Sequence, residues 1–147
     1  MDVLSKKERS DVMSRVRSRG NASTELYLAS LLRRSSAHGW RRHMSLVGRP
    51  DFAFLGQRVA IFVDGCFWHK CPKCYRQPKS RKAFWIEKIR VNRARDRRVN
   101  KMLRAKGWKV IRIWECDLKR NPSRCIKRII RAIATSNPDG ARLRRDR

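Results

Sequence analysis

The segment at residues 62–74 concentrates side chains that could do chemistry. It reads Phe-Val-Asp-Gly-Cys-Phe-Trp-His-Lys-Cys-Pro-Lys-Cys and overlaps the end of the apolar run at residues 59–63. Three of the five cysteines of the chain, an aspartate, a histidine and two large aromatic residues follow this apolar run. An apolar run of this length is typical of a buried strand. The pattern predicts a strand that delivers a carboxylate into a metal-binding turn.

The spacing of the cysteines predicts a tetrahedral metal site. A strand predicted over residues 108–115 would carry Cys116 to the cluster if it lies beside the strand at residues 59–64. Four thiolates are the ligand set of a closed, structural zinc site. Scattered free cysteines are the alternative, and His69 could replace one thiolate; because four cysteines already fill the shell, we expect His69 to serve another purpose. The candidate ligands are Cys66, Cys71, Cys74 and Cys116.

Carboxylates supply a second set of ligand atoms. Asp51 begins one predicted strand and Asp64 ends the next, so antiparallel pairing would bring both to the same edge of a sheet. With Glu25 nearby they would form an oxygen-ligand site suited to Mg²⁺. His69 is a candidate general base or acid at neutral pH. Each carboxylate alone could instead pair with an arginine, and Glu25 could interact with its helix dipole at the solvent end.

The charge of the chain defines the class of its partner. With 39 Lys and Arg against 12 Asp and Glu, the net charge is +27, which favours nucleic acid or an anionic membrane surface. A membrane is the weaker choice, because no apolar run approaches the ~20 residues of a spanning helix, and the first residues resemble no secretory signal. Clustered cysteines in odd number predict a reducing cytoplasm. Charge alone does not separate a structural RNA binder from an enzyme that acts on DNA.

The elements that must position these residues form a mixed α/β domain, a small sheet flanked by helices. We expect a basic N-terminal helix or arm over residues 1–20 that orders on a partner, a folded domain over residues 21–135, and a disordered basic tail over residues 136–147. Within the domain, the predicted elements are a helix at 23–34, a hairpin of strands 50–55 and 58–64, a helix at 81–106 with a possible break near Asn92, a strand at 108–115, and a helix from Asn121.

Helical periodicity identifies the buried faces. In the helix at 23–34, one face carries Glu25, Leu28, Ala29 and Leu32, so that a carboxylate in line with core leucines needs a partner. In the last helix, the core face consists of Ile126, Ile129, Ile130 and Ile133. Beside this stripe, Cys125 is expected to be a small buried apolar residue rather than a ligand.

Five separated motifs then occur in a characteristic order. They are Gly48-Arg49-Pro50-Asp51-Phe52, Val63-Asp64-Gly65-Cys66-Phe67-Trp68-His69, Phe84-Trp85-Ile86-Glu87-Lys88-Ile89, Asn92-x3-Asp96-Arg97 and Gly107-Trp108-x5-Trp114-Glu115-Cys116. Together they resemble the very-short-patch-repair (Vsr) DNA mismatch endonucleases over roughly residues 8–133. The resemblance implies a restriction-endonuclease-like fold of the PD-(D/E)xK type with a structural zinc. It also implies strand-specific nicking of duplex DNA at a T:G mismatch left by deamination of 5-methylcytosine.

The resemblance also implies roles for individual residues. Asp51 would hold Mg²⁺, with the backbone carbonyl of Val63 completing the shell, while His69 would activate or position the attacking water and Glu25 would support the site. Large aromatics in a ligand loop cannot all belong to the core, and wedges exploit the easy unstacking of a mismatched step. Packing beneath the zinc loop remains the alternative for Phe67. The expected wedge consists of Phe67, Trp68 and Trp85.

This chain departs from the family pattern in two ways. The second strand of the nuclease motif usually ends in acid-x-Lys, whereas Asp64 is followed here by Gly65 and Cys66. The activation of water therefore falls to His69. Some relatives carry histidine at the position of Asp64 and among the zinc ligands at Cys71. Asp64 could thus be a second Mg²⁺ ligand or an orienting group, and we expect a ligand.

Two other functions remain open on the sequence. One is a non-catalytic, zinc-stapled nucleic-acid binder that uses charge and stacking only. The other is a nuclease of the same fold with a different DNA target. For the mismatch endonuclease, the expected partner is duplex DNA with a T:G mismatch, with a MutL-type repair protein as a further candidate. We expect a monomer in the bacterial cytoplasm, associated with the nucleoid when bound.

Overall fold

A computed structural model describes residues 5–7 and 24–136. The predicted N-terminal arm, apart from residues 5–7, and the predicted tail beyond Ser136 lie outside the described residues. A four-stranded sheet has the order β1-β2-β3-β4, with β1 at Trp40–Arg42, β2 at Phe52–Phe54, β3 at Val59–Asp64 and β4 at Lys109–Trp114. The helices are α2 at Glu25–Arg33, α3 at Lys82–Ala105, α4 at Glu115–Arg120 and α5 at Pro122–Ala134. This is the small mixed α/β fold that the sequence predicts.

The pairing of the strands confirms the predicted hairpin. β2 and β3 are antiparallel, with Phe52 opposite Ile61 and Phe54 opposite Val59. β4 lies parallel to β3, as the placement of Cys116 requires. β1, which pairs antiparallel with β2, was not predicted, because three residues are too few to show a periodicity.

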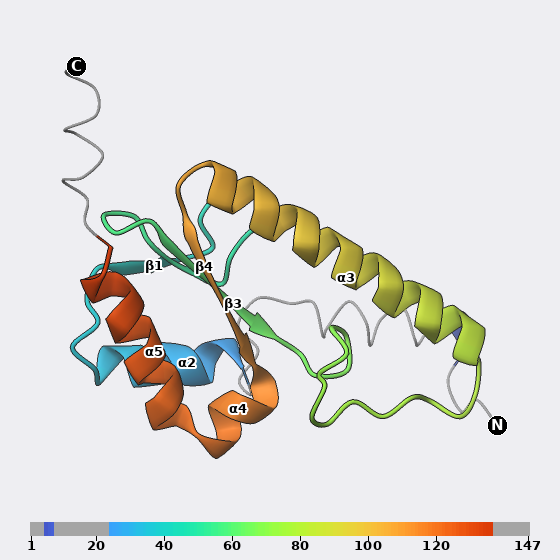
Figure 1. Ribbon diagram of the computed structural model, residues 1–147. Helices are drawn as coiled ribbons and strands as arrows, with labels where there is room; N and C mark the ends of the chain where they lie inside the picture. Colours follow the sequence, from blue (N-terminus) through green and yellow to red (C-terminus); the bar gives the residue numbers. More distant parts are fainter. Residues whose placement is uncertain (1–4, 8–23, 137–147) are drawn as a thin grey trace.

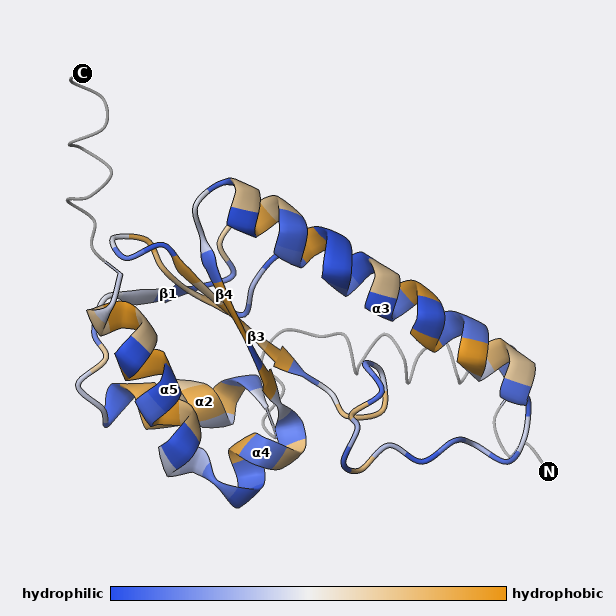
Figure 2. Ribbon diagram, viewed as in Figure 1, coloured by the Kyte–Doolittle hydropathy of each residue, from blue (hydrophilic) through white to orange (hydrophobic). Residues whose placement is uncertain are grey.

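The sheet separates two hydrophobic cores. Along β3, Val59 and Ile61 belong to the core beneath α2 and α5, whereas Ala60 and Phe62 belong to the core beneath α3. Successive side chains of a strand point to opposite faces, so a strand covered on both sides is apolar throughout. Figure 1 shows α3 on one side of the sheet and α2 and α5 on the other, and in Figure 2 the central strand β3 is mainly orange, whereas α3 is mainly blue.

The long helix α3 continues past the end of the sheet. It runs unbroken for 24 residues, so the break considered near Asn92 is absent. The buried residues Ile89, Val99 and Leu103 hold its inner face, and Gly107, at φ +84°, follows its end. Figure 1 shows the first turns of α3 passing the loop that follows β3. The helix thereby links the sheet to the segment that carries most of the candidate chemistry.

The C-terminal helices complete the core. α5 follows Asn121 and has Pro122 in its first turn. Ile129 and Cys125 are buried on its inner face, which confirms the predicted burial of both residues. The short helix α4 begins immediately after β4 and was not predicted. Cys116 therefore lies in the first turn of a helix rather than at the end of a strand. None of the helices in the described part of the chain is both long and apolar enough to cross a bilayer.

Gly48 allows the turn before Asp51 to approach α3. Its φ is +74°, and a Cβ atom there would lie 2.3 Å from Cγ1 of Val99. We expect Gly48→Ala to lower the free energy of unfolding by about 2 kcal/mol or more, since the clash adds to the backbone strain. Gly39→Ala is the matched control, because its φ is +86° with nothing within 4 Å of the added atom. Urea unfolding of both variants measures the difference, and equal losses would contradict the predicted clash.

Candidate active site and cysteine cluster

Asp51 lies in the turn just before β2 and is anchored to β3. Its Oδ2 accepts a hydrogen bond from the backbone N–H of Val63 at 2.7 Å. Burial raises the pKa of Asp51 to about 6; the hydrogen bond from Val63 opposes this shift, and the charges of Glu25 and Asp64 add to it. The predicted convergence of carboxylates is therefore present, and it carries an electrostatic penalty that a cation would relieve.

Glu25 is buried at the first turn of α2, with 6 % of its surface exposed. Its Oε1 accepts hydrogen bonds from Arg42 Nη2 at 2.8 Å and from Arg42 Nε at 3.2 Å, and contacts His43 Nε2. This position excludes the alternative of a solvent-exposed residue at the end of the helix. The sequence did not predict Arg42 and His43 as partners of Glu25 because it did not predict β1. Arg42 is the last residue of β1, and His43 follows it.

Asp64 ends β3, as predicted, and is buried on the face that α3 covers. Its Oδ1 accepts a hydrogen bond from Arg112 Nη1 at 2.9 Å, and His69 Nε2 lies 3.9 Å from the same oxygen. Burial raises the pKa of Asp64, although His69 and Arg112 oppose the shift. The sequence interpretation of Asp64 as a second Mg²⁺ ligand did not include Arg112. One carboxylate oxygen of Asp64 is therefore engaged by a guanidinium, and its role as ligand or orienting group stays a prediction.

His69 contacts a carboxylate of α3 through one ring nitrogen. Its Nδ1 is hydrogen-bonded to Asp96 Oδ2, so that Nε2 is the nitrogen on the side of Asp64. Burial alone would raise the pKa of Asp96, but the hydrogen bond and charge of His69, together with Arg112, leave it lowered. A carboxylate held on Nδ1 fixes the orientation of a histidine and makes Nε2 the reactive atom.

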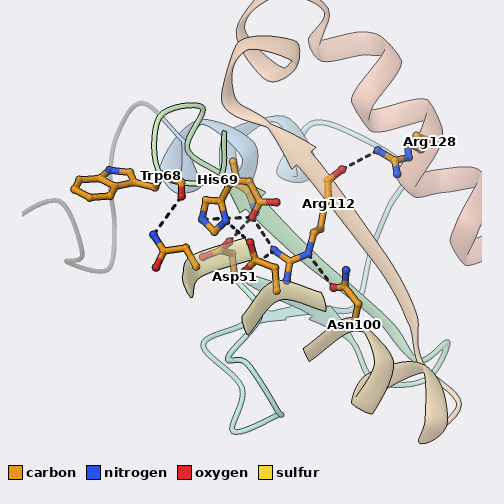
Figure 3. Close-up of polar contacts among 10 residues, drawn as sticks. Asp51, Trp68, His69, Asn100, Arg112 and Arg128 are labelled. Atoms are coloured by element: carbon orange, nitrogen blue, oxygen red, sulfur yellow. Dashed lines mark hydrogen bonds and ion pairs between the residues drawn. The ribbon is translucent and has the colours of Figure 1, made fainter. Parts of the chain in front are cut away.

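Helix spacing predicts that Asn92 and Asp96 act from one face of α3, although it does not reveal their partners. Asn92 and Asp96 are four residues apart and so share one face of α3. Asn92 Nδ2 donates to the backbone carbonyl of Trp68 at 3.2 Å, while Asp96 holds His69. One turn of α3 thus fixes two successive residues of the loop. Figure 3 shows Trp68, His69 and Arg112 around this point.

The four predicted cysteines come together at the base of the same loop. Their Sγ atoms all lie within 4.8 Å of one another, and Cys71 Sγ is 3.7 Å from Cys116 Sγ. The N–H of Cys116 also donates to Cys66 Sγ at 3.4 Å. Burial is the main reason that the pKa of the Cys66 thiol is raised to about 11. Converging thiols of this kind can hold a metal ion, whose charge would stabilise the thiolates.

The predicted wedge residues form one aromatic cluster. Phe67 lies edge-on to Trp68 and to Trp85, with 5.2 Å between ring centroids in each pair, and Trp68 is 5.9 Å from Trp85. All three side chains are half-buried, and none belongs to either hydrophobic core of the described residues. Tyr75 lies 6.0 Å from Phe67 and extends the cluster along the loop. The arrangement leaves large ring surfaces at the edge of the domain.

A cavity of about 600 Å³ opens beside His69. Asp64, Asp96 and Arg112 are the more buried part of its lining, and Lys70 and Arg97 are exposed. Exposed cations beside less accessible carboxylates suit a substrate with both a reacting phosphate and flanking phosphates.

A small mixed sheet that gathers buried carboxylates and a histidine–aspartate pair at one end, in a chain of net charge +27, defines a nuclease-type site. The family model described as DNA mismatch endonuclease Vsr matches residues 1–76. The DNA mismatch endonuclease Vsr of Escherichia coli (strain K12) is 42 % identical over 120 residues, which cover 80 % of this chain and 76 % of that protein. The chain therefore belongs to the Vsr family of DNA endonucleases, which confirms the resemblance.

Two further relatives carry the name of nicking enzymes. Type II nicking enzyme V.XorIIP of Xanthomonas oryzae pv. oryzae (strain KACC10331 / KXO85) is 42 % identical over 120 residues, covering 80 % of this chain and 86 % of that protein. Type II nicking enzyme V.NaeI of Lentzea aerocolonigenes is 49 % identical over 67 residues, covering 46 % of this chain and 40 % of that protein.

Proposed function

We propose that this protein nicks one strand of duplex DNA at T:G mismatches that arise by deamination of 5-methylcytosine, and that the reaction depends on Mg²⁺. One observation carries the proposal. The loop after β3 holds three clustered cysteines, presents His69 to Asp96, and places Phe67 and Trp68 against Trp85. A reactive histidine and a set of stacking rings on one short loop are expected where cleavage takes place beside an unstacked base step.

Asp51 and the backbone carbonyl of Val63 are the proposed Mg²⁺ ligands. The fit rests on the raised pKa of Asp51, because burial and two neighbouring carboxylates disfavour its charged form until a cation arrives. When bound, Mg²⁺ would polarise the scissile phosphate and acidify a water molecule. Glu25, held by Arg42 and His43, would complete the negative surroundings of the site.

His69 is proposed to accept the proton of the attacking water through Nε2. Asp96 fixes the ring through Nδ1 and would stabilise the imidazolium that forms. Asp64, whose Oδ1 lies 3.9 Å from Nε2, adds a second negative charge beside the ring. We assign to Asp64 this orienting role in place of metal ligation, because Arg112 holds the same oxygen.

Zinc is the metal proposed for the cysteine cluster, since four thiolates form a closed tetrahedral shell with no open position. The ion would do no chemistry. It would fix the loop so that His69 and the wedge meet the DNA together.

The wedge predicts a loss of mismatch preference when a ring is removed. We expect Trp68→Ala to weaken binding of a T:G duplex by about tenfold and binding of a matched duplex by much less, because stacking on a base is worth about 1–3 kcal/mol. Ile86→Ala is the control, since Ile86 is an exposed apolar residue next to Trp85 on α3. Dissociation constants for both duplexes at one salt concentration provide the measurement. Equal losses on the two duplexes would show that Trp68 only packs the loop.

A nicking assay on T:G, C:G and T:A duplexes, with and without Mg²⁺, tests the proposed function. We expect a single-strand nick in the T:G duplex that requires Mg²⁺. Absence of cleavage in every duplex, with tight binding, would favour the non-catalytic binder, and substitutions at Asp51 and His69 would then be silent. Equal cleavage of all three would favour a nuclease of this fold with another target.

A further inference from the structure

We infer that Arg112 is a positioning residue for His69, which it governs through the two carboxylates beside the imidazole. The inference rests on the proposed nicking activity and adds a residue to its machinery. Arg112 lies in the middle of β4, on the face of the sheet that α3 covers. Its Nη1 donates to Asp64 Oδ1 at 2.9 Å and lies 3.5 Å from Asp96 Oδ1. One guanidinium therefore bridges both acidic neighbours of His69.

The guanidinium is itself fixed from two further directions. Its Nε donates to Asn100 Oδ1 at 2.9 Å, and its carbon lies 4.2 Å from the ring centroid of Phe62, the residue opposite Arg112 in the β3–β4 ladder. Figure 3 shows Arg112 between Asn100 and His69. Planar stacking combined with a forked set of donors is what an arginine can provide and a lysine cannot. The position of the charge is thus determined by Asn100 and Phe62, neither of which lines the cavity beside His69.

Electrostatics explains why His69 needs this bridge. Asp64 and Asp96 are both close to one imidazole, and Asp64 is 5 % exposed. Two such carboxylates repel each other unless a cation lies between them. Arg112 supplies that cation through Oδ1 of each carboxylate, while Asp96 keeps its hydrogen bond to Nδ1 through Oδ2. Without it, we expect Asp64 and Asp96 to move apart and the ring to lose its single orientation.

The same contacts argue against a direct role for Arg112 in binding DNA. Its donors engage side chains of β3 and α3, and its plane lies over Phe62. Other cations in the wall of the cavity, Arg93 and Arg97, are available for phosphates. Loss of Arg112 should therefore slow the chemical step and leave the affinity for the duplex nearly unchanged.

The test compares nicking rates with binding in the full-length protein. Under single-turnover conditions with T:G duplex and Mg²⁺, we expect Arg112→Met to slow nicking by about 100-fold and Arg112→Lys by about tenfold, because small misplacements of catalytic groups cost about that much. The dissociation constant for the duplex should change by less than about twofold. Arg128→Met is the matched control, since Arg128, on α5, donates to the backbone carbonyl of Arg112 rather than to a carboxylate beside His69.

A double substitution separates positioning from a general loss of structure. In an Asp96→Asn background, Arg112→Met should slow nicking by less than about threefold more, because both residues act through the same ring. If the rate losses of Asp96→Asn and Arg112→Met multiply in the double variant, the inference is overturned. A loss of duplex affinity as large as the loss of nicking rate would overturn it as well. If the methionine variant is unstable to heat, the lysine variant, which keeps the charge, gives the same comparison. A wild-type protein that nicks no T:G duplex refutes the proposed function, whereas equal rates for wild type and both Arg112 variants refute this inference alone.

Discussion

Asp51→Asn is expected to abolish Mg²⁺-dependent nicking and, at the same time, to stabilise the metal-free protein at neutral pH. Nicking should fall by at least about a thousandfold, since the neutral amide of asparagine cannot replace a negatively charged carboxylate as a Mg²⁺ ligand. Binding of the T:G duplex should persist, because the wedge and the cations are untouched. The gain in stability follows from the environment of Asp51, which disfavours its negative charge.

The sign of the stability change follows from the pKa of Asp51. Burial raises this pKa to about 6 in the folded protein, whereas the pKa of an aspartate in an unfolded chain is about 3.9. The folded state thus binds the proton more tightly, and the free energy of unfolding falls as pH rises from about 4 to about 6. Asparagine keeps the acceptor for the N–H of Val63 and carries no charge, so we expect a gain of about 2 kcal/mol at pH 7 and none near pH 4.

Thermal unfolding at both pH values, with and without Mg²⁺, measures these effects. Mg²⁺ should stabilise the wild type at pH 7 and leave Asp51→Asn unchanged, because binding to the folded state alone raises stability. Glu87→Gln is a suitable control, since Glu87 is an exposed carboxylate whose pKa Arg90 lowers, and its loss should not stabilise. A variant that nicks normally, or that is destabilised at pH 7, would rule out Asp51 as the metal ligand.

Local patterns in the sequence predicted the part of the site that lies on neighbouring residues. Alternation and a short glycine turn placed Asp51 and Asp64 at the same end of a hairpin, and the N–H of Val63 indeed donates to Asp51. The spacing of three cysteines, with one strand set beside another, placed Cys116 with them. These arguments succeed because register within a hairpin and ligand geometry within a turn are fixed by few residues.

The contacts that sequence reasoning missed join distant residues or very short elements. Arg112 follows Asp64 by 48 positions. In a chain with so many arginines, no local pattern distinguishes this one as the partner of Asp64. Asp96 reaches His69 from a helix 27 positions later. Arg42 belongs to a three-residue strand that has no periodicity of its own. Charge partners of this kind depend on tertiary packing, which local sequence patterns do not reveal.

Cys71→Ser is expected to abolish binding of the zinc proposed for the cysteine cluster, loosen the loop after β3 and reduce nicking by at least about a hundredfold, because His69 and the wedge lie on that loop. Cys71 is the buried member of the cluster, with 1 % of its surface exposed. A water molecule therefore has the least access to its position as a substitute metal ligand. Zinc binding contributes on the order of 10 kcal/mol to the folding of small peptides. Cys125→Ala is the matched control, since Cys125 is also buried but packs in the core beneath α5. Metal content, nicking and thermal stability of both variants provide the measurements.

Loss of the metal should disorder the loop after β3 and leave the rest of the domain folded, so the result distinguishes a local role of the metal from a global one. Of the residues that the structure describes, neither hydrophobic core includes a member of the loop at residues 65–75. The sheet and its helices should therefore keep their circular dichroism after metal removal, while preference for T:G over matched duplex disappears and salt-dependent binding of any duplex remains. Cooperative unfolding of the whole domain would instead make the metal a general stabiliser. Unchanged nicking by Cys71→Ser, with the metal lost, would show that α3 alone holds the loop through Asn92 and Asp96.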